Sequence, residues 1–373
     1  MTPTKPSLEL LRSLSDEHVL RALMAQRRAT RAELAVATGL SKPTVSESVR
    51  RLTTAGLVVD TGERTTGRGR IGTYYGLPAT TGYALVAGIA PEGIVAEAVD
   101  VYGEVVARSE AQVSRAPGAR HVARTLERVA GEVAARAAGP VRVAVVSAAD
   151  PVDRASGRLV ELPDSPFLVG ALDAPTVLAD LVDGPVVVDN DVNWMARAEH
   201  GPEDFVYVYL GEGVGAAVVS DGEVRRGHAG LAGEIAHVLT TGPCGAAMRL
   251  TDVFGALGLR RPGSTAIDVP ALLRAPDEVR DALARAVAGL LSAAVALADP
   301  AVVLVGGPWG RDPVVLAAVA REFAQAPRHI PVQAAAVEHE PALAGARETA
   351  LRRLRDAIVA AAARHPGVDV QQG

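Results

Sequence analysis

The sequence predicts a winged helix-turn-helix domain over residues 1–80, followed by an α/β body over residues 81–373 with two similar lobes and a cleft between them. Residues 31–59 have the layout of two short helices joined by a turn, and residues 61–72 form a tip rich in glycine and arginine. Beyond residue 83, hairpin strands followed by helices and buried strands occur twice. The 373 residues, of which 49% are hydrophobic, can form more than one core.

The helix-turn-helix is predicted from its helix boundaries and from the spacing of its apolar residues. The first helix stops at Gly39, and Ser41 can cap the second, with Pro43 in the first turn, where a missing N–H has no cost. A buried stripe at i, i+4 and i+7 is formed by Val45, Val49 and Leu52. Residues 57–60 then read as a strand that leads into the wing.

The other face of the second helix carries hydrogen-bonding and cationic side chains, which contact base edges and phosphates in DNA complexes. The predicted DNA contacts of this motif are Arg31, Ser41, Lys42, Thr44, Ser46, Glu47, Arg50 and Arg51. A small helical domain with a polar surface would share this pattern. The tip favours DNA binding, because Arg68 and Arg70 flank a glycine and can enter a narrow minor groove, as at A·T tracts.

The distribution of charge points to the same end of the chain. Residues 1–80 hold 12 Lys and Arg against 7 Asp and Glu, whereas the remaining residues hold 26 against 36. A basic head on an acidic body predicts that only the head meets nucleic acid. Helix-turn-helix proteins commonly bind DNA as dimers, so we expect a homodimer or homotetramer on a double-stranded operator that is an imperfect palindrome.

Cysteine content and the start of the chain predict the compartment. The first residues contain no long apolar run, so we expect neither a signal peptide nor a membrane span. Cys244 is the single cysteine, which leaves no disulfide within the chain. The expected location is the cytoplasm, without a membrane partner.

The body is expected to contain one strand-and-helix series in residues 81–200 and a second in residues 201–341. A C-terminal helix at about residues 342–363 is expected to pack on the first lobe. The predicted strands are 83–90, 94–99, 104–113, 141–147, 185–189, 205–210, 215–220, 223–225, 302–305 and 330–337. The predicted helices include 118–138, 175–182, 192–200 and 281–298.

Four short motifs in this order resemble those of the ROK family, which contains sugar-responsive repressors and sugar kinases. They are Asn190-Asp191-Val192-Asn193, the glycine-rich run 211–215, the run 232–237 (AGEIAH) and Gly306-Gly307. The resemblance covers nearly the whole chain, including the winged helix. It implies an actin-like, two-lobed fold for the body.

The resemblance also implies a sugar site. In kinases of this fold a carboxylate at a strand end takes the proton of the attacking sugar hydroxyl, and Asp191 matches that position. Asn190, Glu234 and His237 match the hydrogen-bonding partners of the sugar, and such side chains suit a ring of hydroxyls. The alternative for Asp191 is a helix N-cap. We therefore expect a carbohydrate effector, or else a relic pocket.

The phosphate-binding parts of the family pattern are altered. Where the kinases have Asp-x-Gly-Gly-Thr, this chain has Ala90, Pro91 and Glu92, in a hairpin that looks shortened. The usual Gly-Thr-Gly reads Gly211-Glu212-Gly213, which places a carboxylate where phosphate would lie and should repel it. The prediction is that the protein is not an enzyme and has no catalytic residues.

Metal and cofactor binding are not expected either. Of the zinc ligands that the resemblance implies, only His237 and Cys244 remain, and structural zinc needs four N or S ligands. Cys244 is therefore expected to be a small buried residue. The family's further sugar-contacting Glu aligns near Thr251, with Asp252 beside it, which leaves the identity of the sugar open.

The sequence thus predicts a DNA-binding transcriptional regulator, a repressor, that responds to a sugar or sugar derivative. A ROK-type sugar kinase with an appended winged helix is the first alternative. A ligand-blind DNA-binding scaffold under the control of a partner protein is the second.

Overall fold

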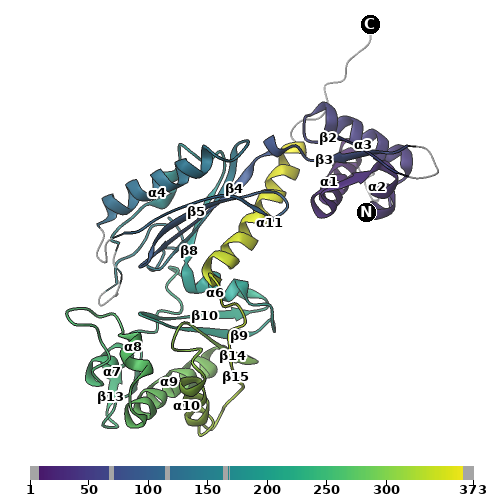
Figure 1. The fold of residues 1–373 in the computed structure, drawn as a ribbon. Coiled ribbons are helices and arrows are strands. Elements are labelled where there is room, and N and C mark those ends of the chain that lie inside the picture. The colour runs from purple at the N-terminus through teal and green to yellow at the C-terminus, as the bar shows by residue number, and fades with distance from the viewer. Residues whose placement is uncertain (1–7, 67–70, 114–117, 163–166, 168, 364–373) are drawn as a thin grey trace, which may run out of the picture.

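The computed structural model describes residues 8–66, 71–113, 118–162, 167 and 169–363. Figure 1 shows a winged helix at one end, a first lobe next to it and a second lobe at the far end. The last helix, α11 (Pro341–Ala363), runs along the first lobe towards the winged helix. This arrangement confirms the predicted fold class, a winged helix-turn-helix joined to an actin-like body.

The described residues of the winged helix form three helices and a three-stranded sheet of order β1-β3-β2. Its elements are α1 (Leu8–Gln26), β1 (Arg28–Thr30), α2 (Arg31–Thr38), α3 (Lys42–Thr54), β2 (Val59–Arg64) and β3 (Thr73–Gly76). The two predicted helices are confirmed, and the Ser41 hydroxyl accepts from the N–H of Thr44 at 3.3 Å as the N-cap of α3. The wing strand begins at Val59 rather than Leu57 and extends into the predicted tip.

The first lobe is built on a five-stranded sheet of order β6-β5-β4-β7-β8. Its strands are β4 (Tyr83–Ala90), β5 (Gly93–Val99), β6 (Val105–Ala111), β7 (Val141–Ala148) and β8 (Val186–Asn190). Helices α4 (Ala119–Ala134) and α5 (Ala174–Leu178) share one core with this sheet. α6 (Asp191–Ala198) and α11 lie against each other, and α11 packs on β4 and β7. A short turn, η1 (Ala79–Thr81), joins the winged helix to β4.

The second lobe repeats this plan with a sheet of order β11-β10-β9-β14-β15. The strands are β9 (Phe205–Leu210), β10 (Val214–Ser220), β11 (Glu223–Val224), β14 (Val302–Gly306) and β15 (Val332–Ala334). The helices are α7 (Leu250–Ala256), α8 (Val269–Leu273), α9 (Asp277–Ala298) and α10 (Pro313–Phe323). A separate hairpin of β12 (Leu239–Thr241) and β13 (Ala247–Arg249) precedes α7.

Among the described helices, α9 is long and apolar enough to cross a membrane by length and composition. It packs on α10 and α7, and residues such as Leu283, Val287 and Leu291 lie in the core of the second lobe. Half of the most apolar 18-residue stretch of α9 is buried in the protein, as in the core helix of a globular domain.

Candidate functional site

The outer face of α3 is the candidate DNA-reading surface. Lys42, Glu47 and Arg50 are exposed on it, and Thr44 and Ser46 are half-buried. The stripe Val45, Val49 and Leu52 is buried, as predicted, and fixes α3 against the winged-helix core. The Arg50 guanidinium donates to both carboxylate oxygens of Glu47, at 2.6 and 3.0 Å, so these two side chains form one unit.

The structure corrects the prediction for Arg51. Its guanidinium donates to the Asp16 carboxylate of α1 at 2.6 and 3.1 Å, and its side chain is only 16% exposed. Arg51 therefore holds α3 to α1 and is removed from the predicted DNA contacts.

Arg31 is exposed and stacks at 4.9 Å over the ring of Tyr75 in β3. This contact links the start of α2 to the wing. The predicted minor-groove pair, Arg68 and Arg70, lies outside the described residues.

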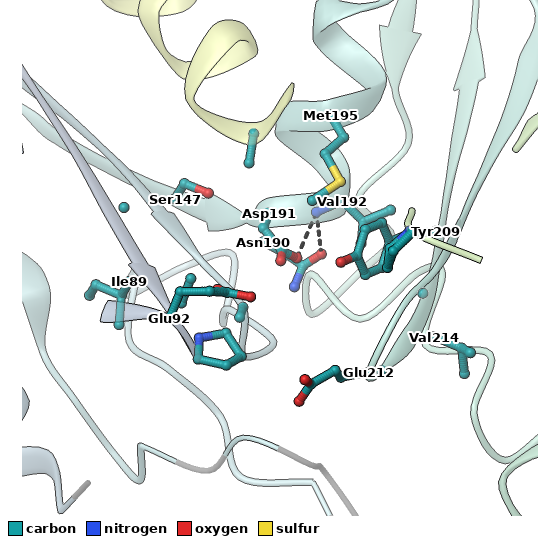
Figure 2. Close-up of a pocket in the computed structure, with 18 of the residues that line it drawn as sticks. Ile89, Glu92, Ser147, Asn190, Asp191, Val192, Met195, Tyr209, Glu212 and Val214 are labelled. Carbon is teal, nitrogen blue, oxygen red and sulfur yellow. Dashed lines mark hydrogen bonds between the residues drawn. The ribbon is translucent and has the colours of Figure 1, made fainter. Parts of the chain in front are cut away.

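The candidate ligand site is a cleft of about 1040 Å³ between the two lobes. Its walls come from the β4–β5 turn, the start of α6, the β9–β10 turn, residues 233–237 and the start of α11. Figure 2 shows Asn190 and Asp191 on one side and Glu212 across the opening. All four predicted ligand residues, Asn190, Asp191, Glu234 and His237, line this cleft.

Asn190, rather than Asp191, caps α6. Its Oδ1 accepts from the N–H of Val192 at 3.0 Å, and its Nδ2 donates to the carbonyls of Ala148 and Asp150. The Asp191 carboxylate accepts from the same N–H at 2.8 Å, as Figure 2 shows. Much of the hydrogen-bonding capacity of Asn190 is thus used to shape the loop, and Asp191 faces the cleft as the first residue of α6.

Burial and neighbouring carboxylates change the titration of this wall. Burial, with contributions from Glu234, Asp150 and Glu92, raises the pKa of Asp191 to about 7. Burial and the nearby Asp150 carboxylate raise the pKa of Glu234 to about 7 as well. Perturbed carboxyl groups in a cleft are typical of functional sites.

Gly233 explains how Glu234 reaches the cleft. Its φ is +98°, and a Cβ on it would lie 2.8 Å from the carbonyl carbon of Ala216, so only glycine fits. The Gly233 carbonyl accepts from the N–H of Ala216 in β10 at 2.9 Å. This close approach to the second-lobe sheet fixes the residue that follows.

Two supporting residues were not predicted from the sequence. Asp189 at the end of β8 is buried, and its Oδ1 accepts from Asn193 Nδ2 at 2.8 Å. Its Oδ2 lies 3.1 Å from Nε of Arg226, which also donates to the carbonyl of Val188. Arg226 follows β11 of the second lobe, so this ion pair joins the two lobes beside the cleft. An Asp at the carboxyl end of a parallel strand was the available signal.

On the side of the cleft where phosphate binding was expected to be lost, the hairpin is short, as predicted, but Glu212 has a partner that was not predicted. The β4–β5 hairpin closes through Pro91 and Glu92 alone, because Ala90 pairs with Gly93. Glu212 lines the cleft, but its carboxylate is paired with Arg261. The negative charge of Glu212 is therefore offset by the Arg261 guanidinium, so the repulsion of phosphate that was expected from Glu212 is reduced.

The region of the expected zinc loop is a β-hairpin. Gly242 and Ala246 close it through a backbone hydrogen bond of 2.8 Å, and the Thr240 hydroxyl donates to the carbonyl of Ala286 in α9. Cys244 at its tip is exposed, so the prediction of a buried cysteine is wrong. Among the described residues, no group of three or more His, Cys, Asp or Glu side chains could hold a metal ion.

Known families match the body and the winged helix of this chain separately. A ROK family model matches residues 91–250, and a winged helix-turn-helix DNA-binding model matches residues 12–59. An N-acetylmannosamine kinase of Escherichia coli O127:H6 is 32% identical over 203 residues, which cover 48% of this chain and 70% of the kinase. The chain belongs to the ROK family.

Solved structures share the fold. A ROK family transcriptional regulator, a homologue of the E. coli MLC protein, superposes with a TM-score of 0.65 over 95% of this chain and 99% of the other, at 17% identity. The ROK hexokinase of Thermus thermophilus gives 0.57 at 25% identity, over 73% of this chain and 99% of the hexokinase. The regulator match extends through the winged helix and the ROK body together.

Proposed function

We propose that this ROK family protein is a transcriptional repressor that binds operator DNA through α3 and responds to a sugar or sugar derivative in its cleft. The observation that carries the proposal is the junction of two parts in one chain. The described part of the winged helix presents Lys42, Thr44 and Ser46 on the outer face of α3, and the attached body contains a cleft lined by polar side chains. Residues 1–80 would be the DNA-binding unit, with 81–200 and α11 as the first lobe and 201–341 as the second.

On DNA, α3 would lie in the major groove with Lys42, Thr44, Ser46 and the Glu47–Arg50 pair near the bases. Arg31 and Ser41 would contact the backbone, and Arg68 and Arg70 the adjacent minor groove. A homodimer or homotetramer would place two such helices on an imperfect palindrome. The protein would act in the cytoplasm, where the DNA is, without a membrane partner.

In the cleft, Asp191, Glu234 and His237 would bind the hydroxyl groups of the ligand, and Asn190 would hold the loop that presents Asp191. Carboxylates and an imidazole suit a polyol better than an anion. The named kinase relatives act on sugars, which supports this ligand class.

The geometry does not favour phosphoryl transfer. Pro91 lacks a backbone donor, and Glu92 adds a negative charge where the kinases of the family bind phosphate. A sugar kinase with a winged helix remains the second candidate function, because Asp191 lies at the cleft with a pKa near 7, suitable for a general base.

Two assays separate these functions. Pull-down of genomic fragments with the full chain identifies an operator, and its affinity is then measured across salt concentrations. A coupled ADP-release assay with a panel of hexoses and amino sugars tests for kinase activity. We expect an operator and no sugar-dependent ADP release. Turnover that Asp191→Asn abolishes would establish the kinase instead.

A thermal-shift screen with mono- and disaccharides and their phosphates tests the ligand. A sugar present at 100 times its Kd stabilises the folded protein by about 2.7 kcal/mol. Operator binding without a shift from any sugar would favour the ligand-blind scaffold.

A further inference from the structure

The helix α11 connects the ligand cleft to the DNA-binding domain. At its N-terminal end, Pro341, Ala342 and Leu343 line the cleft. Towards its C-terminal end, Leu354 and Ile358 are buried in one core with the α1 residues, which are Val19, Leu20, Leu23 and Met24. A continuous helix is stiff over this length, so both ends move together.

Polar contacts fix α11 to the winged helix. Arg355 Nε donates to the carbonyl of Val101 at 3.0 Å, and its Nη2 donates to the carbonyl of Met24 at 3.5 Å. Arg21 of α1 donates to the Asp356 carboxylate at 3.1 Å. Arg355 therefore bonds to the end of α1 and to the first lobe at once.

A second contact lies at the turn between β5 and β6. Arg27, which follows α1, pairs with Glu104, and its guanidinium stacks at 5.2 Å over the ring of Tyr102. The Tyr102 hydroxyl donates to the carbonyl of Arg27 at 3.2 Å. The winged helix thus contacts the first lobe at two places, in addition to its covalent connection through residues 77–82.

At the cleft, α11 is held tightly against α6, the helix that begins with Asp191. A Cβ on Gly345 would collide with the carbonyl oxygen of Trp194 and lie 2.8 Å from its carbonyl carbon. The two helix backbones are therefore in direct contact at Gly345. The other side of α6 faces the second lobe, where Val192 and Met195 share a core with Phe205 and Tyr207 of β9.

The start of α11 is also anchored to the first-lobe sheet. Arg347 donates to both oxygens of the buried Glu97 of β5, at 2.7 and 2.8 Å, and Arg108 of β6 donates to the same carboxylate. Glu340, at φ +46° before the helix, accepts from both arginines and lines the cleft. These ion pairs fix the start of α11 to β5 and β6.

We propose that α6 and α11 form a rigid connection that transmits occupancy of the cleft to the winged helix. A ligand that draws the second lobe towards Asp191 would displace α6. Because α6 contacts α11 at Gly345, α11 would move with it. This movement would rotate α1 and with it the DNA-reading face of α3. The inference rests on the proposed function for its regulatory meaning, but the mechanical connection can be tested without DNA.

The test is hydrogen exchange on the full chain, comparing wild type with the double variant Arg355→Ala/Asp356→Ala. The matched control is Arg353→Ala, an exposed arginine of the same helix that forms no hydrogen bond or ion pair with any described residue. We expect exchange in α11 and in the first turn of α6 to accelerate about tenfold in the double variant, as loss of junction hydrogen bonds would allow. Exchange in α10, which packs in the core of the second lobe, should stay at the wild-type rate in the double variant. Exchange in the Arg353→Ala control should be unchanged throughout.

Gly345 lies about 15 Å along the helix from Arg355, so a rigid α11 should carry the effect of the substitutions to its contact with α6. Unchanged exchange in α6 of the double variant would therefore refute the connection. With operator DNA and a sugar found by thermal shift, the double variant should bind both yet lose the sugar-dependent change in operator affinity. Retention of that change would also refute the proposal. Absence of any operator would refute the proposed function, and the exchange result would still decide the connection.

Discussion

Replacing Gly345 by alanine tests the contact between α6 and α11. In a helix interior this change normally stabilises by about 0.5–1 kcal/mol, since glycine is the poorer helix former. Here the added methyl group would lie 2.8 Å from the Trp194 carbonyl carbon and 3.2 Å from the N atom of Ala198. Both are backbone atoms that cannot rotate away, so the two helices must separate. Overpacking of this kind costs about 1–3 kcal/mol, and we expect a net loss of about 1–2 kcal/mol in the free energy of unfolding.

The matched control is Gly131→Ala in α4, where a Cβ would meet nothing within 4 Å. This variant should gain about 0.5–1 kcal/mol, so the same substitution has opposite signs in two helices. Urea unfolding followed by tryptophan fluorescence measures both, with Trp194 at the contact itself. Equal stabilisation of the two variants would show that α6 and α11 are not in backbone contact, and would remove the basis of the rigid connection.

Three further predictions concern the winged helix, the cleft and the cysteine. Lys42→Ala should weaken operator binding by about 1–3 kcal/mol without loss of stability, as expected of a side chain near the bases. Arg51→Ala should instead lower the free energy of unfolding by about 1.5–3 kcal/mol, because it breaks the paired bonds to Asp16. The reverse pattern in binding and urea unfolding would refute the assignment of these two residues. The carboxyl groups of Asp191 and Glu234 hold protons in the folded state that they lose in the unfolded state, so stability should fall as pH rises from about 4 to 7. In Asp191→Asn/Glu234→Gln this dependence should flatten, and an unchanged pH profile would contradict the raised pKa values. Cys244 should react with a thiol reagent in the native protein, and reaction only after denaturation would contradict its exposure.

Much of the fold was predictable because periodicity and turn residues agree with the final packing. The β4, β9 and β14 strands are short apolar runs at sheet positions, and their predicted bounds differ from the structure by at most one residue. By contrast, α1 was missed, although Val19, Leu20, Leu23 and Met24 repeat at helical spacing. Its mean apolar character is low and its first turns are exposed, so the pattern is strong only in its second half.

The sequence indicated which residues lie in the cleft, but not which partners their side chains bind. Asn190, Asp191, Glu234 and His237 come together at one cleft, in keeping with their motifs. The partners of Glu212 and Arg51 depend on long-range contacts, to Arg261 and to Asp16, that no local pattern encodes. The buried Asp189–Arg226 pair likewise joins segments from two lobes. Local sequence thus indicates which residues face a site. Tertiary packing decides which of their side chains already form ion pairs or hydrogen bonds with other residues.

The central claim is that the winged helix is the output of a ligand-sensing body. The most direct measurement is the affinity of the full chain for its recovered operator, at fixed salt, with and without the sugar that gives the largest thermal shift. The account predicts that this sugar changes operator affinity by about 5- to 150-fold, the usual range of allosteric coupling. Operator affinity that is identical with and without a tightly bound sugar would contradict it.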